Sequence, residues 1–383
     1  MKQAPPSRAS APTKRRVLFT GHAPVHFLCF RPLFERLRQI PGVEVYVSGG
    51  FRHESDQGYE YDPLSLYRQL SVPVEHILQV EDIFERDFDV LFAANTNMLE
   101  PRSAVLKVQI FHGVSFRNRA VRAANLGADR FFMVGPYMKR KFVEAGLLEA
   151  DDPKALEIGF MKTDALLDES LDRQLLRDQY GLDGSRPIVA FCPTGQKNNA
   201  LDVYGLDLIE RIKDSGRYDL LIKLHDHPHD STDWSGMISG IQDRHTRLVE
   251  SYDVMPVLFT ADLLITDASS VSSEYSLLDR PILFMDTPDL IERARQKAGS
   301  MADTMTWGHA LGAIVKSVDD LLPAADSALA RPDEHASIRR QAACDLFFNP
   351  GTATQTALDW FLNQQSGTSP SPPPRHLIPH VHP

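Results

Sequence analysis

The chain has 383 residues, of which 43% are hydrophobic and 24% are charged, and its formal net charge is −10. The length predicts two domains, and the composition is ordinary for a globular protein. The negative charge argues against a nucleic-acid partner, and no apolar run approaches the roughly 20 residues of a membrane span. The N-terminus lacks the apolar core of a signal peptide, and three scattered cysteines without a Cys-x-x-Cys pair indicate reduced thiols. These features predict a cytoplasmic protein, and peripheral attachment to the inner membrane face stays open.

Short apolar runs alternate with helical patterns along most of the chain. Strands are predicted at residues 17–20, 43–47, 89–93, 105–111 and 130–134, with helices at 30–40 and 137–145. The pattern then restarts, with strands at 187–191, 219–224, 261–265 and 281–285 and helices at 203–213, 337–346 and 352–363. This alternation predicts an α/β protein made of two Rossmann-like, doubly wound parallel sheets.

The repeated pattern also predicts the domain boundaries. Residues 15–167 would form an N-terminal Rossmann-like domain, and residues 168–350 a C-terminal one, with a helix at 351–365 that crosses back to the first domain. Residues 1–14 read as a disordered leader, and 366–383 as a disordered tail rich in proline and histidine. Because ligands of open α/β sheets bind beyond the carboxyl ends of the strands, two facing sheets would line one interdomain cleft.

The most informative stretch joins a predicted strand to a predicted helix. The apolar residues 261–265 lead to Asp267 and the pair Ser269-Ser270, and Glu274 follows one helical turn later. A strand that ends in small hydroxyl residues at a helix start offers free backbone N–H groups and a positive dipole end to a phosphate. Glu274 would lie on the same side and accept hydrogen bonds from a ribose. An ordinary helix cap is the alternative.

A histidine stands at another predicted strand end. His112 directly follows an apolar run, and the basic residues Arg117, Arg119 and Arg122 come after it. A histidine has an unperturbed pKa near 6.5, so it can take a proton from a hydroxyl group at neutral pH. The arginines would hold substrate phosphates. A loop histidine beside a solvated basic face is the alternative interpretation.

A cluster of polar side chains follows the predicted strand at 219–224. Lys223 and His225 come first, and His227 and His229 continue at a spacing of two residues. The histidines could form a metal site on an extended segment. His225 could instead contact a phosphate or leaving group, and a simple polar loop is the third interpretation.

Three weaker signals lie elsewhere. Thr194 follows the strand at 187–191, where it and the adjacent amides could approach a phosphate. In the stretch from Gly159 to Asp164, the glycine would make a turn and Asp164 would cap a helical turn at 165–167. His26 follows the first predicted strand and would lie on the acceptor side of the cleft.

As an ordered set, these motifs between residues 88 and 290 resemble the CDP-glycerol glycerophosphotransferase family, enzymes that build teichoic-acid-type polyol phosphates. The family's His-Gly motif with a following basic residue looks like His112-Gly113 with Arg117, and its Pro-Thr looks like Pro193-Thr194. Three further motifs match with one departure each. They are Gly159–Asp164, with Met161 where proline is usual, Lys223-Leu224-His225, with Asp226 in place of proline, and Thr266-Asp267-Ala268-Ser269-Ser270 with Glu274, where Ala268 replaces an aromatic residue.

The resemblance implies the GT-B type fold, with the acceptor on the N-terminal domain and the CDP-linked donor on the C-terminal domain. It implies that the catalytic residues are His112, as general base, and His225, which assists the phosphate. Arg117, Arg119 and His26 would contact the acceptor or phosphate groups. The donor-binding residues it implies are Thr194, Lys223, Ser269, Ser270 and Glu274.

The implied reaction moves glycerol phosphate, or a similar polyol phosphate, to a hydroxyl of a glycan or lipid-linked acceptor and releases CMP. No metal and no other cofactor is expected. A GT-B glycosyltransferase that uses a nucleotide sugar, a nucleotide-sugar 2-epimerase and a non-catalytic binding protein are the alternatives.

Overall fold

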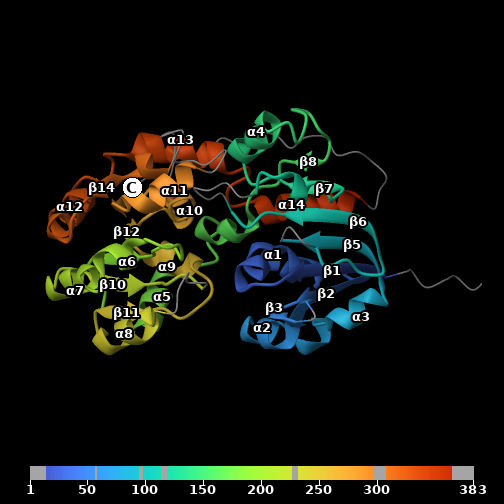
Figure 1. Cartoon of the computed structure of the whole chain (residues 1–383), viewed down its shortest axis with the longest axis horizontal. Coiled ribbons are helices and arrows are strands. Elements are labelled where there is room, and N and C mark those ends of the chain that lie inside the picture. The colour runs from blue at the N-terminus through green and yellow to red at the C-terminus, as the bar shows by residue number, and fades with distance from the viewer. Residues whose placement is uncertain are drawn as a thin grey trace, which may run out of the picture. The chain divides into compact units, whose positions relative to one another are not determined.

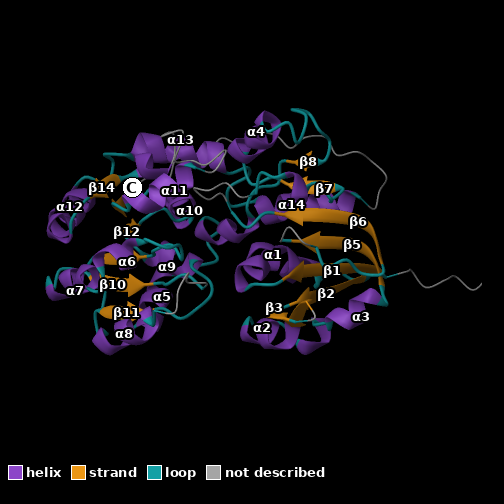
Figure 2. Ribbon diagram, viewed as in Figure 1, coloured by secondary structure: helices purple, strands orange, loops and turns teal. Residues whose placement is uncertain are grey.

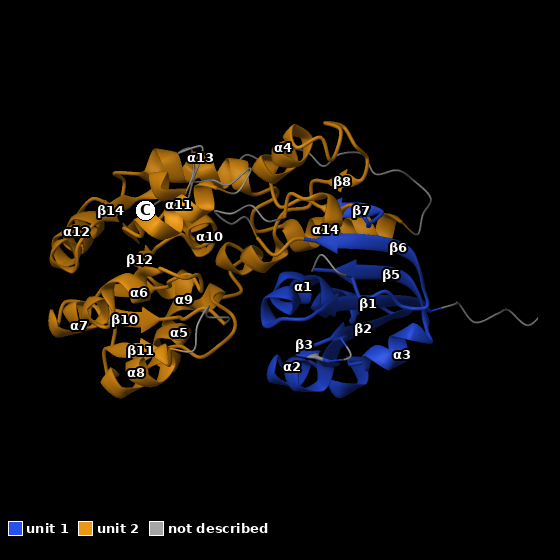
Figure 3. Cartoon of the chain, in the orientation of Figure 1, with its two compact units in different colours: residues 1–110, 127–131 blue, residues 111–126, 132–383 orange. Residues whose placement is uncertain are grey.

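Two six-stranded β-sheets form the framework of the protein (Figure 1, Figure 2). The computed structural model describes residues 14–56, 58–94, 98–113, 120–226, 232–296 and 308–364. By their contacts the residues divide into two compact units, 1–110 with 127–131 and 111–126 with 132–383 (Figure 3).

The first sheet has the strand order β2-β1-β5-β6-β7-β8, and β1, β2, β5 and β6 pair in parallel. The interior strand β1 is buried from Val17 to Gly21, as expected for a parallel strand that is covered on both faces. An antiparallel hairpin, β3-β4, was not predicted, because its residues are polar and lack an apolar run. The strands are β1 Arg15–Gly21, β2 Val43–Gly49, β3 Phe51–Ser55, β4 Gly58–Asp62, β5 Asp87–Ala93, β6 Ser103–Ile110, β7 Arg130–Phe132 and β8 Ala155–Leu156. The helices along this part of the chain are α1 Pro24–Leu37, α2 Pro63–Gln69, α3 Val80–Phe84 and α4 Pro136–Glu144.

The second sheet has the order β11-β10-β9-β12-β13-β14, and all its neighbouring strands pair in parallel. This is the 3-2-1-4-5-6 order typical of a Rossmann fold, in which the chain reverses direction across the sheet between β9 and β12. The strands are β9 Ile188–Phe191, β10 Asp219–Ile222, β11 Thr246–Leu248, β12 Leu263–Thr266, β13 Ile282–Met285 and β14 Ala313–Val315. The helices are α5 Arg173–Tyr180, α6 Ala200–Tyr204, α7 Asp207–Asp214, α8 Trp234–Ile241, α9 Met255–Thr260, α10 Val271–Tyr275, α11 Pro288–Arg295, α12 Val318–Ala330, α13 Ala336–Leu346 and α14 Ala353–Asn363.

Two of the predicted helices differ clearly from the structure, and α2, α3, α5, α8, α9, α11 and α12 were not predicted. Helix α1 begins at Pro24 rather than Phe30, because proline fits the first turn, where its missing N–H would have no helical partner. The helix predicted at 203–213 is two helices, α6 and α7, interrupted at Gly205, whose φ is +61°. Within the described residues, no helix is long and apolar enough to cross a lipid bilayer.

The C-terminal segment packs against residues 132–164. The amide of Phe348 donates to the carbonyl of Val134 at 2.8 Å, and the rings of Phe132 and Trp360 meet edge to face at 5.1 Å. Asp164, predicted to cap residues 165–167, instead accepts hydrogen bonds from the first amides of α14, Ala353 N at 3.1 Å and Thr354 N at 2.7 Å. A tertiary partner therefore replaces the local cap, and these contacts place residues 132–167 in the second unit rather than in the first.

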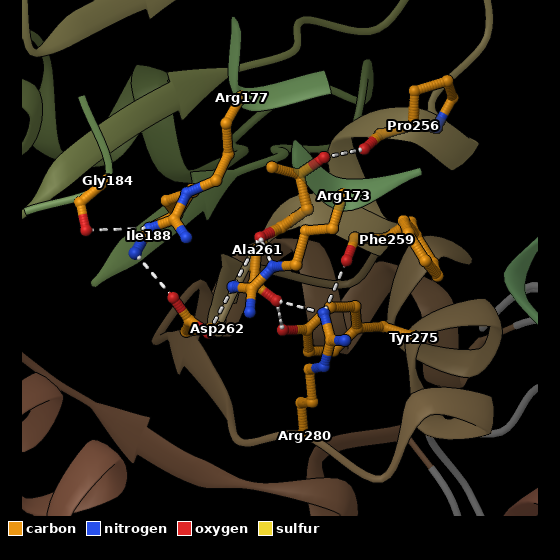
Figure 4. A network of polar contacts seen from close by, with 11 residues as sticks. Arg173, Arg177, Gly184, Ile188, Pro256, Phe259, Ala261, Asp262, Tyr275 and Arg280 are labelled. Atoms are coloured by element: carbon orange, nitrogen blue, oxygen red, sulfur yellow. Dashed lines mark hydrogen bonds and ion pairs between the residues drawn. The ribbon is translucent and has the colours of Figure 1, made fainter. Parts of the chain in front are cut away.

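A network of arginines fixes the chain just before β12 (Figure 4). Arg280 donates to the carbonyls of Phe259 and Ala261 at 2.6 and 2.7 Å, and the hydroxyl of Tyr275 donates to Ala261 at 3.0 Å. Arg173 forms an ion pair with Asp262 and donates to the Thr260 carbonyl at 2.9 Å. Because Tyr275 belongs to α10, the network holds β12 and α10 in a fixed relation, and the loop between them is positioned by both.

Replacing Gly159 with alanine is expected to lower the free energy of unfolding by roughly 2–4 kcal/mol. Gly159 has a φ of +103°, and an added Cβ would lie 2.1 Å from the carbonyl oxygen of Phe348. Gly146→Ala is a matched control, since Gly146 also has a positive φ, +64°, but has nothing within 4 Å of an added Cβ. Urea unfolding should show a loss of about 1 kcal/mol for the control. Equal losses in the two variants would show that the contact with Phe348 contributes nothing.

Candidate functional site

Two loops meet where the strand order of the second sheet reverses. Residues 192–199 follow β9, and residues 267–270 follow β12, its neighbour across the reversal. In open α/β sheets this is the position at which ligands bind. The site is therefore built from the loops at the carboxyl ends of the second sheet.

Asp267 ties these two loops together. Its carboxylate accepts hydrogen bonds from the amides of Thr194 and Ala200, both at 2.9 Å, and it is fully buried. Burial raises the pKa of Asp267 to about 6, although the backbone N–H groups that it accepts oppose the rise. These contacts give Asp267 a structural role, because they hold the loops after β9 and β12 together.

A cavity of about 410 Å³ opens beside the loop after β9. Its walls come from residues 193–195 after β9, 223–226 after β10, 248–250 after β11 and 232–235 at the start of α8. Its volume is in the range of cavities that hold small organic ligands. The cavity brings together three residues predicted from the sequence, Thr194, Lys223 and His225.

Lys223 is the buried cation of this cavity, with only 8% of its surface exposed. Its ammonium donates to the Asp226 carboxylate at 2.7 Å and to the Leu224 carbonyl at 2.5 Å. His225 is exposed at the cavity wall. Asp226, which stands where the family motif has proline, therefore neutralises the lysine that a phosphate would approach.

Ser269 and Ser270 lie at the start of α10. Ser269 is buried and its carbonyl accepts from the Ser272 hydroxyl at 2.9 Å, whereas Ser270 is partly exposed and its side chain caps no helix amide. Helix α10 is shorter than the pattern suggested, because a 3-10 turn continues it from Ser276 to Leu278. Neither serine lines the cavity, but Asp267 links their loop to Thr194.

Glu274 on α10 is 3% exposed and forms an ion pair with Lys162, 9% exposed, at 3.4 Å. Burial raises the pKa of Glu274, and the nearby Lys162 ammonium acts in the opposite direction. A Cβ added at Gly113 would lie 3.7 Å from Glu274 Oε1, so the His112-Gly113 turn lies against this carboxylate. His112 itself is exposed. The second unit thus brings His112, Glu274 and the loop of Ser270 into one neighbourhood.

Cys192 directly follows β9. It is buried, which raises the pKa of its thiol to about 12, and the charges of Lys223, Glu274 and Asp267 also act on it. The thiol is therefore protonated at neutral pH.

Other predicted residues are not brought to this site by the described structure. Arg117, Arg119, His227 and His229 lie outside the described residues. His26 is in the first unit, buried at 6% exposure, and its Nδ1 accepts a hydrogen bond from the His22 amide at 3.1 Å. That bond gives His26 a structural role, and its contact with an acceptor stays a prediction.

The sequence analysis did not single out two residues that belong to the site. Trp234 lines the cavity from the start of α8, and Lys162 pairs with Glu274. Lys162 is the basic residue of the stretch Gly159–Asp164, so its place in that motif could have indicated a role in the site. Nothing in the local sequence indicated Trp234. Across the described ranges, no group of three or more histidine, cysteine or acidic side chains could hold a metal ion.

A model of the family described as CDP-glycerol:poly(glycerophosphate) glycerophosphotransferase matches residues 108–355. The teichoic acid glycerol-phosphate primase of Bacillus spizizenii is 28% identical over 169 residues, which are 43% of this chain and 42% of that protein. The teichoic acid poly(glycerol phosphate) polymerase of Staphylococcus epidermidis is 30% identical over 145 residues, 35% of this chain and 19% of that protein. The matches therefore span less than half the length of these curated relatives.

A solved structure of the wall teichoic acid polymerase TagF matches with a TM-score of 0.66 at 16% sequence identity, covering 92% of this chain and 89% of that chain. This likeness, together with the two Rossmann-like sheets, shows that the fold is of the GT-B type that the sequence predicted.

Proposed function

Because the chain belongs to the CDP-glycerol:poly(glycerophosphate) glycerophosphotransferase family, whose model matches well over half of it, we propose that it transfers glycerol phosphate from CDP-glycerol to an acceptor hydroxyl. The acceptor is a glycan or lipid-linked molecule of the cell surface, and CMP is released. The observation that carries the proposal is the cavity of about 410 Å³ that joins Thr194, Lys223 and His225 at the strand ends of a Rossmann sheet.

The donor's nucleotide occupies the second unit. Thr194, Lys223 and His225 contact its phosphates, and the loop of Ser269 and Ser270 supplies further hydrogen-bond donors. Lys223 exchanges its bond to Asp226 for a phosphate oxygen when the donor binds. Glu274 accepts hydrogen bonds from the ribose hydroxyls.

The transfer is a displacement at the β-phosphorus. The acceptor oxygen forms a bond with this phosphorus, the bond to the bridging oxygen breaks, and CMP leaves with the electron pair. His112 takes the proton of the acceptor hydroxyl as general base. Lys223 and His225 stabilise the negative charge that develops on the leaving phosphate. Arg117, Arg119 and His26 are proposed to contact the acceptor or its phosphates.

The reaction as proposed uses side chains alone, with no metal and no other cofactor, so EDTA should leave the rate unchanged. We place it in the cytoplasm, where the free thiols of Cys29, Cys192 and Cys344 are stable, with peripheral attachment to the inner membrane face for a lipid-linked acceptor.

A thermal-shift panel of CDP-glycerol, CDP, UDP-sugars and GDP-sugars tests the donor. CDP-glycerol and CDP at about 100 times their dissociation constant should add about 2.7 kcal/mol to the stability, which raises Tm by several degrees. CMP release in the presence of a lipid that carries a terminal glycerol phosphate then tests transfer. Stabilisation by a UDP- or GDP-sugar alone would overturn the proposal in favour of a glycosyltransferase or an epimerase, and tight CDP binding without CMP release would favour a binding protein.

A further inference from the structure

Lys162 is a buried cation to which the proposed reaction gives no role. Its Nζ lies 3.4 Å from Glu274 Oε2, and both side chains are more than nine-tenths buried. An unpaired ammonium or carboxylate at such a depth is strongly unfavourable, so the ion pair stabilises both charged groups. The pair joins two segments that are 112 residues apart in the sequence.

The backbone that carries Lys162 is fixed at both ends. Gly159 packs directly against the Phe348 carbonyl, where no Cβ would fit, and Asp164 holds the first two amides of α14. Between them, the Thr163 hydroxyl donates to the Phe160 carbonyl at 2.7 Å. Because both ends of its segment are anchored in this way, the backbone of Lys162 has a fixed position. Its ammonium therefore attracts the Glu274 carboxylate to a defined place.

Four other residues contribute to the surroundings of the Lys162–Glu274 pair. Gly113, next to His112, lies on the side of Oε1, and the Phe160 ring lies 5.9 Å from the Lys162 ammonium. Asp253, before α9, repels the carboxylate and raises the pKa of Glu274, as burial does more strongly, and Cys192 is a neutral thiol at neutral pH. Lys162 is thus the group that opposes both the burial and the repulsion.

We propose that Lys162 is a positioning residue of the donor site: it keeps Glu274 ionised and oriented so that the carboxylate accepts hydrogen bonds from the donor's ribose hydroxyls beside the His112-Gly113 turn. This inference rests on the proposed function. An ionised carboxylate can accept from both hydroxyls of the diol, whereas a protonated one must donate its own hydrogen and loses part of that capacity.

Lys162→Met should raise the KM for CDP-glycerol by about 10- to 100-fold, with kcat little changed. This is the loss of affinity expected when hydrogen bonds to a charged group are removed. The loss should be largest at low pH. Without the ammonium the pKa of Glu274 rises further, so the carboxylate ionises, and KM recovers, only as the pH of the assay is raised. The wild type should show no such recovery, and Lys162→Arg should stay within a few-fold of the wild type because it keeps the charge.

Lys139→Met is a control for the loss of a lysine charge, because Lys139 forms an ion pair with Glu157 at 2.9 Å that is more exposed than the Lys162–Glu274 pair. The double variant Lys162→Met/Glu274→Gln replaces both charges and keeps the shapes, so it should fold even if the single variant does not. We expect this double variant to recover thermal stability and to retain the high KM. A double variant with the KM of the wild type would show that the pair is only structural and would overturn the inference.

CDP-induced thermal shifts separate this inference from the proposed function. If CDP fails to stabilise the wild type and no CMP is released, the proposed function fails and the role of Lys162 falls with it. If the wild type responds to CDP and Lys162→Met responds equally at every pH, only the inference is wrong.

Discussion

Replacing His112 with alanine is expected to lower the turnover of CDP-glycerol by about 10²–10⁴-fold, the usual weight of general base catalysis. The acceptor hydroxyl must lose its proton as it attacks phosphorus, and the imidazole is the group proposed to take it. His112 is exposed, so its removal leaves no buried cavity and the variant should unfold at the temperature of the wild type. CMP release under saturating donor measures the effect on kcat.

The location of His112 makes this prediction specific. The turn it shares with Gly113 lies against Glu274, so the base stands next to the element proposed to hold the donor's ribose. His53→Ala is a suitable control, because His53 is an exposed histidine on β3 in the other unit. Turnover of His112→Ala that matches the wild type would remove His112 from the role of base. A loss of donor affinity with unchanged kcat would make it a binding residue instead.

The sequence predicted the sheets well because their signal is local. Long apolar runs such as residues 187–191 and 281–285 mark buried parallel strands, and β9 and β13 coincide with them within one residue. Three of the four strands of two or three residues, β8, β11 and β14, were missed, since so short a segment has no period to read, whereas β7 lies within the predicted range 130–134. The hairpin β3-β4 was missed because its strands are largely polar.

The site was predictable to the extent that its residues follow strands. Thr194, Lys223 and His225 come directly after β9 and β10, and the parallel order of those strands places them at one cavity. Contacts between distant segments were not predictable in this way. The ion pair of Lys162 with Glu274 depends on how a 3-10 turn packs against α10, and no local pattern encodes it.

The same difference explains Asp164, which was predicted to be a local cap, and Asp267, which stands before a predicted helix. The Asp267 carboxylate does bind backbone amides, but these belong to residues 194 and 200, across the strand-order reversal. Asp164 caps α14, almost 190 residues further along the chain. An acidic residue before a helical turn therefore predicts that backbone amides will be bound, although the sequence does not say which ones.

Replacing His225 with alanine is expected to lower kcat by about 10²–10³-fold, the weight of one donor that stabilises developing charge. His225 is exposed at the cavity wall beside Lys223, where the phosphate of the leaving CMP would lie. The loss should appear in kcat more than in the donor's KM, because the charge on the leaving oxygen develops only in the transition state. His225→Gln keeps an N–H donor and should recover part of the rate, as measured by CMP release.

Parallel alanine variants of His227 and His229 decide which histidine of this segment acts. The cavity contains His225, so those two variants should keep rates within a few-fold of the wild type. A large loss in His227→Ala with normal turnover in His225→Ala would shift the role by two residues, to the histidine that precedes Pro228. Added zinc that rescues any of the three variants would instead support a metal site on this segment.

Since Asp226 binds Lys223 in the cavity, Asp226→Asn should also lower the donor's KM, because the phosphate then has no carboxylate to displace. An unchanged KM in Asp226→Asn would place the phosphate away from Lys223 and would weaken the assignment of His225 as well.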